Sequence, residues 1–312
     1  MQILERNGFQ IANGKLLVNG ELLNGVSVSG QYAKEVGPET LANDISSRFP
    51  GINVVRLGTS PEGGALTQGV PLQGGQTVAD IDATIRALNA KGIGVIVDNH
   101  GSHAFDDNNV SQAGREPAWF AQIARDNLGN NMVMFQTLNE PTGADSDIVK
   151  EQQAAYDAIR ATGSNAIVAF DLAYTNAVAE GRRTGSASPM ESNPNAYNRD
   201  YNYVIDAHSY AGVSTDPVAQ LNGEIAETSN LREADGAPVP VYIGETGPSI
   251  DGVNIDPKAN ENLDAVWNAG TGGIIGLYNG PSQGGLDALC DRDGTLNSTG
   301  KKAADLIKRG AV

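Results

Sequence analysis

Two glutamates with the same local context are the strongest candidates for chemistry in this sequence. Glu140 follows the apolar run of MVMFQTLNEPTG, and Glu245 follows the apolar run of VPVYIGETGPS. A short and continuously apolar run is typical of a strand buried on both faces of a parallel sheet, so each glutamate is expected where such a strand ends. A pair of carboxyl groups can cleave a glycosidic bond, because one protonates the leaving oxygen while the other attacks the sugar carbon or activates a water.

Each glutamate also has a simpler interpretation. Glu140 precedes Pro141 and could begin a helix, where the helix dipole favours an acidic side chain. Glu245 lies between Gly244 and Gly247 and could be a turn carboxylate bonded to local backbone. The repetition of a strand-ending glutamate favours the chemical interpretation over two coincidences.

The elements that must position these glutamates form a regular alternation. Five stretches have apolar residues at helical spacing, and one of them, Thr77–Lys91, ends at Gly92 as a helix should. The other four are Pro117–Leu128, Ile148–Thr162, Asn260–Asn268 and Lys301–Arg309. Eight short apolar runs lie before, between and after them, at Leu23–Val28, Ile52–Leu57, Ile93–Asp98, Met132–Leu138, Ala166–Phe170, Val204–Asp206, Val239–Ile243 and Gly272–Leu277.

This alternation predicts an α/β fold, a single (β/α)8 TIM barrel that spans residues 1–312. Turn signals at Asn13-Gly14 and Asn19-Gly20 predict a short N-terminal hairpin within residues 1–22, which would close the bottom of the barrel. Long loops at 58–75 and 181–201 follow predicted strands and would lie at the C-terminal face, where barrels build their sites. A doubly wound open sheet is the alternative, but the turn after Val28 lacks the glycine pattern that binds phosphate.

The bulk composition excludes several functions. The net charge is −16, which would repel a nucleic acid. No run of about 20 apolar residues predicts a membrane span. Cys290 is the single cysteine, so neither an intrachain disulfide nor a cysteine-based zinc site is possible. We expect a monomer that is secreted by means of a leader not contained in this sequence or, less favoured, one that is cytoplasmic.

Five motifs at the predicted strand ends resemble glycoside hydrolase family 5, the cellulase-type retaining barrels of clan A. They are Asn-Val-Val-Arg-Leu at 53–57, Val-Asp-Asn-His-Gly at 97–101, Asn-Glu-Pro at 139–141, Asp-Ala-His-Ser-Tyr at 206–210 and Ile-Gly-Glu at 243–245. Their order along the chain and their places at strand ends make the set specific, and the resemblance covers nearly the whole chain.

The resemblance implies a double-displacement hydrolase with Glu245 as nucleophile and Glu140 as acid/base. Arg56 would support the nucleophile, Asn139 would contact the sugar 2-hydroxyl, and Tyr210 would hydrogen-bond Glu245. His100 and His208 would line the site. The family usually ends its eighth strand with a tryptophan beneath the sugar, whereas this chain has GGIIGLYNGPSQ there, so Tyr278 and Asn279 are expected in its place. Trp119 and Trp267 fall in helical stretches and are expected in the core.

The expected substrate is a β-linked glucan, with β-1,4-glucan first, as for an endoglucanase or cellulase. A β-mannanase and an exo-acting β-glucosidase-type enzyme are alternatives within the family. Two alternatives of other classes are a non-catalytic carbohydrate-binding barrel and a metal-dependent barrel hydrolase, which a chelator would inhibit. A zinc site made of His100, His103 and His208 is disfavoured, because two of them are close in a loop and the third is distant. No metal and no cofactor are therefore expected.

Overall fold

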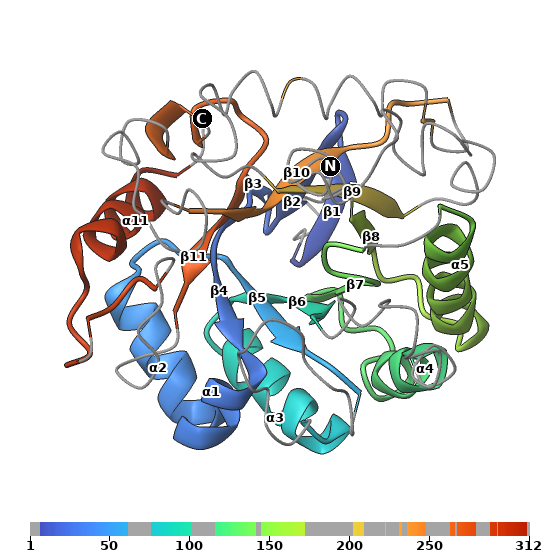
Figure 1. The fold of residues 1–312 in the computed structure, drawn as a ribbon, viewed down its shortest axis with the longest axis horizontal. Coiled ribbons are helices and arrows are strands. Elements are labelled where there is room, and N and C mark those ends of the chain that lie inside the picture. The colour runs from blue at the N-terminus through green and yellow to red at the C-terminus, as the bar shows by residue number, and fades with distance from the viewer. Residues whose placement is uncertain are drawn as a thin grey trace, which may run out of the picture.

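Eight parallel strands form a closed barrel in the computed structural model, which confirms the predicted TIM barrel. The structure describes residues 7–61, 76–100, 116–141, 145–171, 202–208, 222, 231–232, 236–247, 263–265, 267–278, 288–291 and 293–310. Around the barrel the strand order is β10-β11-β4-β5-β6-β7-β8-β9 (Figure 1). The strands are β4 (Asn24–Ser29), β5 (Val54–Thr59), β6 (Gly94–Asn99), β7 (Val133–Gln136), β8 (Val168–Asp171), β9 (Tyr203–His208), β10 (Val241–Thr246) and β11 (Gly273–Leu277).

A small antiparallel sheet lies against the N-terminal end of the barrel. It consists of β1 (Phe9–Ala12), β2 (Lys15–Val18) and β3 (Glu21–Leu22) in that order. Asn13 and Asn19 both adopt positive φ at its turns, as the turn signals predicted. The Phe9 ring packs on Gly94, where a Cβ would lie 2.9 Å from the ring. The sheet therefore covers the barrel interior from the side opposite to the predicted site.

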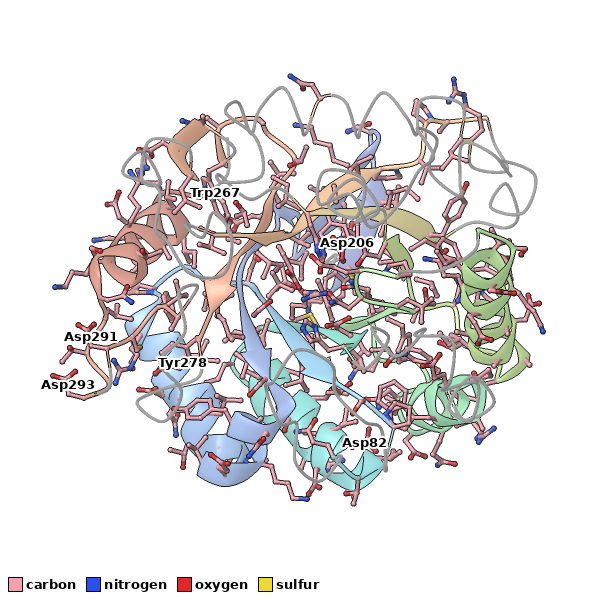
Figure 2. All side chains as sticks on the ribbon, in the orientation of Figure 1. Asp82, Asp206, Trp267, Tyr278, Asp291 and Asp293 are labelled. Carbon is pink, nitrogen blue, oxygen red and sulfur yellow. The ribbon has the colours of Figure 1, made fainter. Side chains whose placement is uncertain are left out.

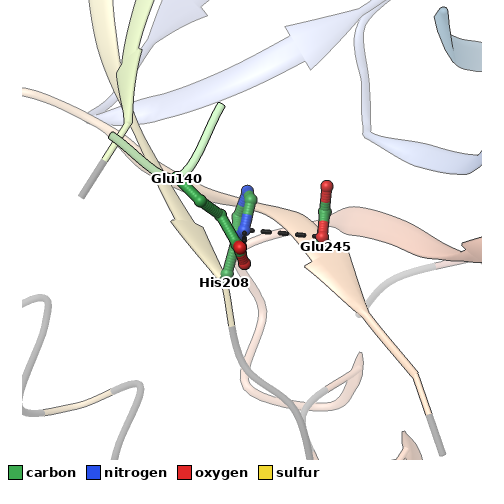
Figure 3. Close-up of side chains that lie close together, drawn as sticks. All are labelled: Glu140, His208 and Glu245. Carbon is green, nitrogen blue, oxygen red and sulfur yellow. Dashed lines mark hydrogen bonds and ion pairs between the residues drawn. The ribbon is translucent and has the colours of Figure 1, made fainter. Parts of the chain in front are cut away.

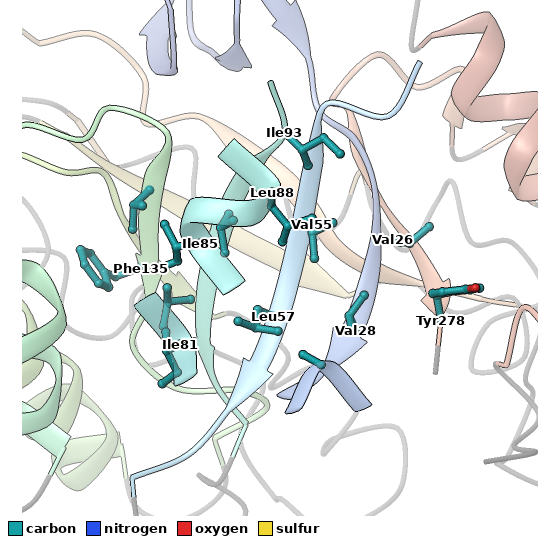
Figure 4. Packing of buried hydrophobic residues seen from close by; sticks show 14 of the residues in the cluster. Val26, Val28, Val55, Leu57, Ile81, Ile85, Leu88, Ile93, Phe135 and Tyr278 are labelled. Atoms are coloured by element: carbon teal, nitrogen blue, oxygen red, sulfur yellow. The ribbon is translucent and has the colours of Figure 1, made fainter. Parts of the chain in front are cut away.

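Side chains alternate along each strand between the barrel interior and the helices outside. On β5, Val54 belongs to the inner apolar cluster, whereas Val55 and Leu57 pack in the outer cluster beneath the helices (Figure 4). The inner cluster unites one side chain from most strands with three from the N-terminal sheet: Val54, Ile96, Met134, Ala169, Val204, Tyr242 and Ile274 with Phe9, Leu16 and Val18.

A polar layer lies directly above this inner cluster. Moving two residues along a strand returns to the same face, and on five strands that step leads from an apolar residue to a charged or amide side chain. Each of these side chains is at most 3% exposed. We call the following set the polar layer: Arg56, Asp98, Gln136, Asp171 and Asp206. Because barrel enzymes build their sites at the C-terminal ends of the strands, the polar layer forms the floor of the predicted site.

Helices pack on the outside of the barrel, and two of the described ones were not predicted from the sequence. They are α1 (Gly30–Val36) and α2 (Pro38–Arg48), separated by Gly37 at φ +85°. The Ser29 hydroxyl caps α1 by accepting a hydrogen bond from the Tyr32 N–H. Neither segment repeats its apolar residues over enough turns to be recognised as a helix from the sequence. The other helices whose bounds fall in the described residues are α3 (Val78–Asn89), α4 (Glu116–Asp126), α5 (Asp145–Ala161) and α11 (Ser298–Arg309). None of the described helices combines the length and the apolar composition that a membrane span needs.

Glu116, at the start of α4, gives a stability prediction. Burial raises the pKa of its carboxyl from 4.5 to about 7, although a hydrogen bond with Asn99 lowers this pKa in part. The unfolded chain therefore releases this proton at lower pH than the folded chain, so stability falls as pH rises from about 4.5 to 7 and stays lower above. At pH 8 we expect the free energy of unfolding of Glu116→Gln to exceed that of the wild type by up to about 3 kcal/mol. Urea denaturation measures this difference. The gain should vanish near pH 4; an equal gain at both pH values would contradict the titration.

Candidate active site

The two glutamates meet at one histidine (Figure 3). His208 Nδ1 lies 3.1 Å from Glu140 Oε1 and 3.5 Å from Glu245 Oε2. One carboxylate oxygen of Glu140 and one of Glu245 lie within 4.8 Å of each other. The histidine is fully buried, whereas the glutamate side chains keep 21% and 13% of their surface exposed. The pair therefore faces the mouth of the barrel over a buried imidazole.

An irregularity in β10 directs Glu245 into the barrel. Ile243 pairs with Ala207 and Glu245 pairs with His208, so the register shifts at Gly244. Such a bulge re-aims the side chain that follows it. Gly244 is required for a second reason, since a Cβ there would overlap the carboxylate of Asp206. The glycine thus admits both the buried aspartate and the turn that presents Glu245.

Arg56 joins the polar layer to Glu245. Its Nη1 donates to Glu245 Oε1 at 2.5 Å, its Nε donates to Gln136 Oε1 at 2.8 Å, and its Nη2 donates to Asn139 Oδ1 at 2.6 Å. Nη2 also lies 3.2 Å from Asp98 Oδ2. Burial by itself would lower the pKa of Arg56, but Asp98 and Glu245 outweigh it and hold the pKa well above its ordinary value. Arg56 is therefore a permanent cation that fixes Glu245 and orients the amide of Asn139.

His208 is surrounded by acidic groups on both sides of its ring. Its Nε2 lies 3.5 Å from Asp171 Oδ2 and 3.6 Å from Asp206 Oδ2. Burial would lower the pKa of His208, but Asp171, Glu245 and Asp206 together raise it well above its ordinary value. Burial also raises the pKa of Asp206, and the neighbouring His208 only partly offsets this. An imidazolium at this position places a positive charge beneath both glutamates.

Glu140 has an unusual backbone conformation. Its φ is +42°, a region that costs a residue with a Cβ roughly 1–2 kcal/mol, and the following Pro141 restricts its backbone further. Its N–H donates to Asp171 Oδ2 at 2.7 Å. The same oxygen accepts from Gln136 Nε2 at 3.3 Å. Strain of this kind persists when surrounding contacts hold it, and it concentrates at functional sites.

The other predicted site residues have different outcomes. His100 lies at the rim with a 38% exposed side chain and its Nδ1 2.8 Å from Asp98 Oδ2. Partial burial lowers the pKa of His100, but the hydrogen bond to Asp98 outweighs it, so the net shift is upward. Tyr210, Asn279 and His103 lie outside the described residues.

The structure corrects the prediction for Tyr278. Its ring is fully buried and packs edge-on against Tyr32 and Phe49, with centroids 6.0 and 5.4 Å away. Its hydroxyl donates to Asp44 of α2, and Figures 2 and 4 show it on the helix side of the barrel. The side chain after β11 alternates outward, so Tyr278 cannot replace a tryptophan beneath the sugar. Trp119 and Trp267 are 8% and 2% exposed, which confirms their prediction as core residues.

Sequence reasoning did not assign roles to Gln136, Asp171 or Asp206, although they contact the predicted residues. Each is a polar residue inside or at the end of an apolar strand, two positions beyond an inner-cluster residue. The same inward register at the end of several strands is a signal that the sequence does contain. It becomes readable once the barrel is assumed and each strand is assigned an inner face.

Two groups of side chains have metal-like spacing within the described residues. They are Glu140 with His208 and Glu245, and Asp171 with Asp206 and His208. Both groups share His208, whose raised pKa favours the protonated ring. A protonated imidazole donates from both ring nitrogens, so charge pairing with the surrounding carboxylates is sufficient to explain the spacing of both groups.

Comparison with known proteins assigns the family. The sequence profile of cellulase (glycosyl hydrolase family 5) matches residues 18–272. The chain belongs to glycosyl hydrolase family 5. The match confirms the resemblance and the enzyme class, glycoside hydrolase, that the strand-end motifs predicted. The matched range contains every described residue of the site.

Individual relatives agree with this assignment. Endo-beta-1,4-glucanase A of Emericella nidulans is 27% identical over 146 residues, which are 45% of each chain. The match thus spans under half the length of that enzyme. Among solved structures, the endo-beta-1,4-glucanase Xac0029 of Xanthomonas axonopodis pv. citri has a TM-score of 0.65 at 18% identity, covering 94% of this chain and 100% of that one. A family 5 xyloglucanase from Paenibacillus pabuli has a TM-score of 0.62 at 17% identity, covering 94% and 99%. At these identities the structures show a shared fold.

Proposed function

We propose that this family 5 protein hydrolyses β-1,4-linked glucans, as an endoglucanase or cellulase does, with retention of configuration. The observation that carries the proposal is the spacing of the glutamates. Retaining enzymes hold their two carboxyl groups about 5–5.5 Å apart, and inverting enzymes hold them about 6.5–9.5 Å apart to admit a water. One oxygen of Glu140 and one of Glu245 lie within 4.8 Å of each other, and this close approach supports the shorter class.

The surroundings of the two glutamates give them different roles. Arg56 donates directly to Glu245, so negative charge is best stabilised there. His208 lies close to both glutamates, so its charge does not distinguish them, whereas the direct hydrogen bond from Arg56 does. Two neighbouring carboxyl groups disfavour double ionisation, and we place the proton on Glu140, which Arg56 does not contact directly. Glu245 is therefore the nucleophile, and Glu140 is the general acid.

The reaction proceeds in two balanced steps. In the first, a Glu245 oxygen bonds to the anomeric carbon while the glycosidic bond breaks, and Glu140 gives its proton to the leaving oxygen. In the second, Glu140 takes a proton from a water whose oxygen attacks the anomeric carbon and releases Glu245. Asn139, oriented by Arg56, is placed to contact the sugar 2-hydroxyl. His100 lines the rim of the same site.

Three features favour a neutral β-glucan as substrate. The net charge of −16 disfavours an anionic polysaccharide, the relatives include an enzyme named for endo-β-1,4-glucanase activity, and the family is that of the cellulases. Such a polymer is too large to enter a cell, which favours a protein that acts after secretion.

The stereochemical outcome tests the proposal. When the protein hydrolyses a cello-oligosaccharide in an NMR tube, we expect the β-anomer of the new reducing end to form first and the α-anomer to grow in later by mutarotation. Initial formation of the α-anomer would rule out retention.

The substrate class needs a separate measurement. Soluble β-1,4-glucan, mannan, xylan and aryl β-glycosides should be compared at equal enzyme concentration, with Glu245→Gln as the inactive control. We expect the highest kcat/KM on β-1,4-glucan and no inhibition by EDTA. Binding without hydrolysis would favour a carbohydrate-binding barrel, and inhibition by EDTA would favour a metal-dependent hydrolase.

A further inference from the structure

Asp171 contacts the backbone of one proposed catalytic glutamate and the ring that touches both. It ends β8, two residues beyond Ala169 of the inner cluster, and is 3% exposed. Its Oδ2 accepts the Glu140 N–H at 2.7 Å and Gln136 Nε2 at 3.3 Å, and it lies 3.5 Å from His208 Nε2. One buried oxygen thus meets three groups that belong to the proposed site.

The hydrogen bond from the Glu140 N–H to Asp171 acts on a residue whose backbone conformation is intrinsically unfavourable. Glu140 has φ +42° and is followed by Pro141, so its conformation is not one that the local chain prefers. A buried charge-assisted hydrogen bond is roughly twice as strong as a neutral one. Asp171 is the described side chain that accepts this N–H, and it opposes relaxation of the turn.

The turn conformation decides where the Glu140 carboxyl points. A rotation about φ would swing the side chain away from His208 Nδ1, 3.1 Å distant, and from Glu245. Proton transfer needs the acid within hydrogen-bond reach of the leaving oxygen. Because Gln136 also accepts from Arg56, the Asp171 contact extends the same hydrogen-bond chain that holds Glu245.

We propose that Asp171 is the positioning residue of the acid/base: its carboxylate holds the Glu140 backbone in the left-handed conformation that aims the Glu140 carboxyl at the leaving-group oxygen. The inference rests on the proposed role of Glu140 in hydrolysis. It assigns Asp171 no contact with substrate, and its effect passes through Glu140 and the His208 ring.

Leaving-group dependence provides the test. Dinitrophenolate departs without protonation, whereas methoxyphenolate needs an acid. In both cases kcat/KM reports the glycosylation step, in which Glu140 acts as acid. For Asp171→Asn we expect kcat/KM on methoxyphenyl β-cellobioside to fall by about 10²-fold, within the range for general acid catalysis, while the value for dinitrophenyl β-cellobioside changes little. Asp171→Ala should lose more than Asp171→Asn, because the asparagine oxygen can still accept the Glu140 N–H.

A matched control separates positioning from general damage. Asp82 of α3 is also buried and accepts a hydrogen bond, from Asn127 Nδ2 at 2.7 Å, but it lies far from Asp206 and the site (Figure 2). Asp82→Asn makes the same chemical change and should leave the ratio of the two kcat/KM values unchanged. Equal losses on both substrates in Asp171→Asn would overturn the proposal and indicate a merely structural role.

A measurement on the unmodified protein keeps the inference independent of folding and of activity. The Glu140 amide proton should resonate strongly downfield and exchange slowly with solvent, because it is bonded to a buried carboxylate. Rapid exchange of this amide would overturn the proposal. If the wild type hydrolyses neither glycoside, the proposed function fails, and a Glu140 amide proton that shifts in Asp171→Asn would still support the backbone hold.

Discussion

Glu245→Gln is expected to lower kcat by about 10⁵-fold or more, as removal of an attacking nucleophile does in other enzymes. A neutral amide cannot form the glycosyl–enzyme bond, so neither step of the cycle proceeds. Glutamine is preferred to alanine because its side-chain oxygen can still accept the hydrogen bond from Arg56 Nη1. An alanine would leave the buried Arg56 charge without this acceptor. The measurement is kcat on β-1,4-glucan, with the midpoint of thermal unfolding recorded for each variant.

Glu35→Gln is a suitable control for this experiment. Glu35 lies exposed on α1, where it accepts a surface hydrogen bond from Gln31. The same substitution there should leave kcat unchanged. If Glu245→Gln keeps more than a few per cent of wild-type kcat, Glu245 is not the nucleophile.

Glu140→Ala is expected to lower kcat by about 10²–10⁴-fold, the range for loss of a general acid or base. On a dinitrophenyl glycoside the first step needs no acid, so the glycosyl–enzyme should form and accumulate, because no base activates the water. Azide is a nucleophile that needs no base, and it should restore a large part of the lost rate. The product should be the β-glycosyl azide, which proton NMR identifies.

The two glutamates differ in what azide would reveal. In a Glu245→Ala variant, azide can replace only the missing nucleophile and would give the α-glycosyl azide. Formation of the α-azide by Glu140→Ala, or absence of any azide effect, would show that the roles are reversed or that Glu140 does not act in the second step.

The sequence determined much of this protein because its strongest signals are local. Continuous apolar runs can only be satisfied when both faces of a strand are buried, so the eight strands of the barrel followed from them. The glycine signals at Asn13-Gly14 and Asn19-Gly20 fixed the turns of the N-terminal sheet. The strand-end motifs placed Arg56, Asn139, Glu140, His208 and Glu245 in one site, because parallel strands of a barrel end on the same face.

The tertiary structure decided which faces the side chains take and which charges meet. Tyr278 was expected beneath the sugar, but it turns outward to Asp44, since one residue of register reverses the direction of a side chain. The polar layer depends on the same register in five strands at once, and Asp171 meets the Glu140 backbone only because β7 and β8 are neighbours in the barrel. Local sequence does not encode such pairings. The position of His208 between two glutamates and two aspartates is set by the side-by-side arrangement of β7, β8, β9 and β10, which brings together residues 68 positions apart.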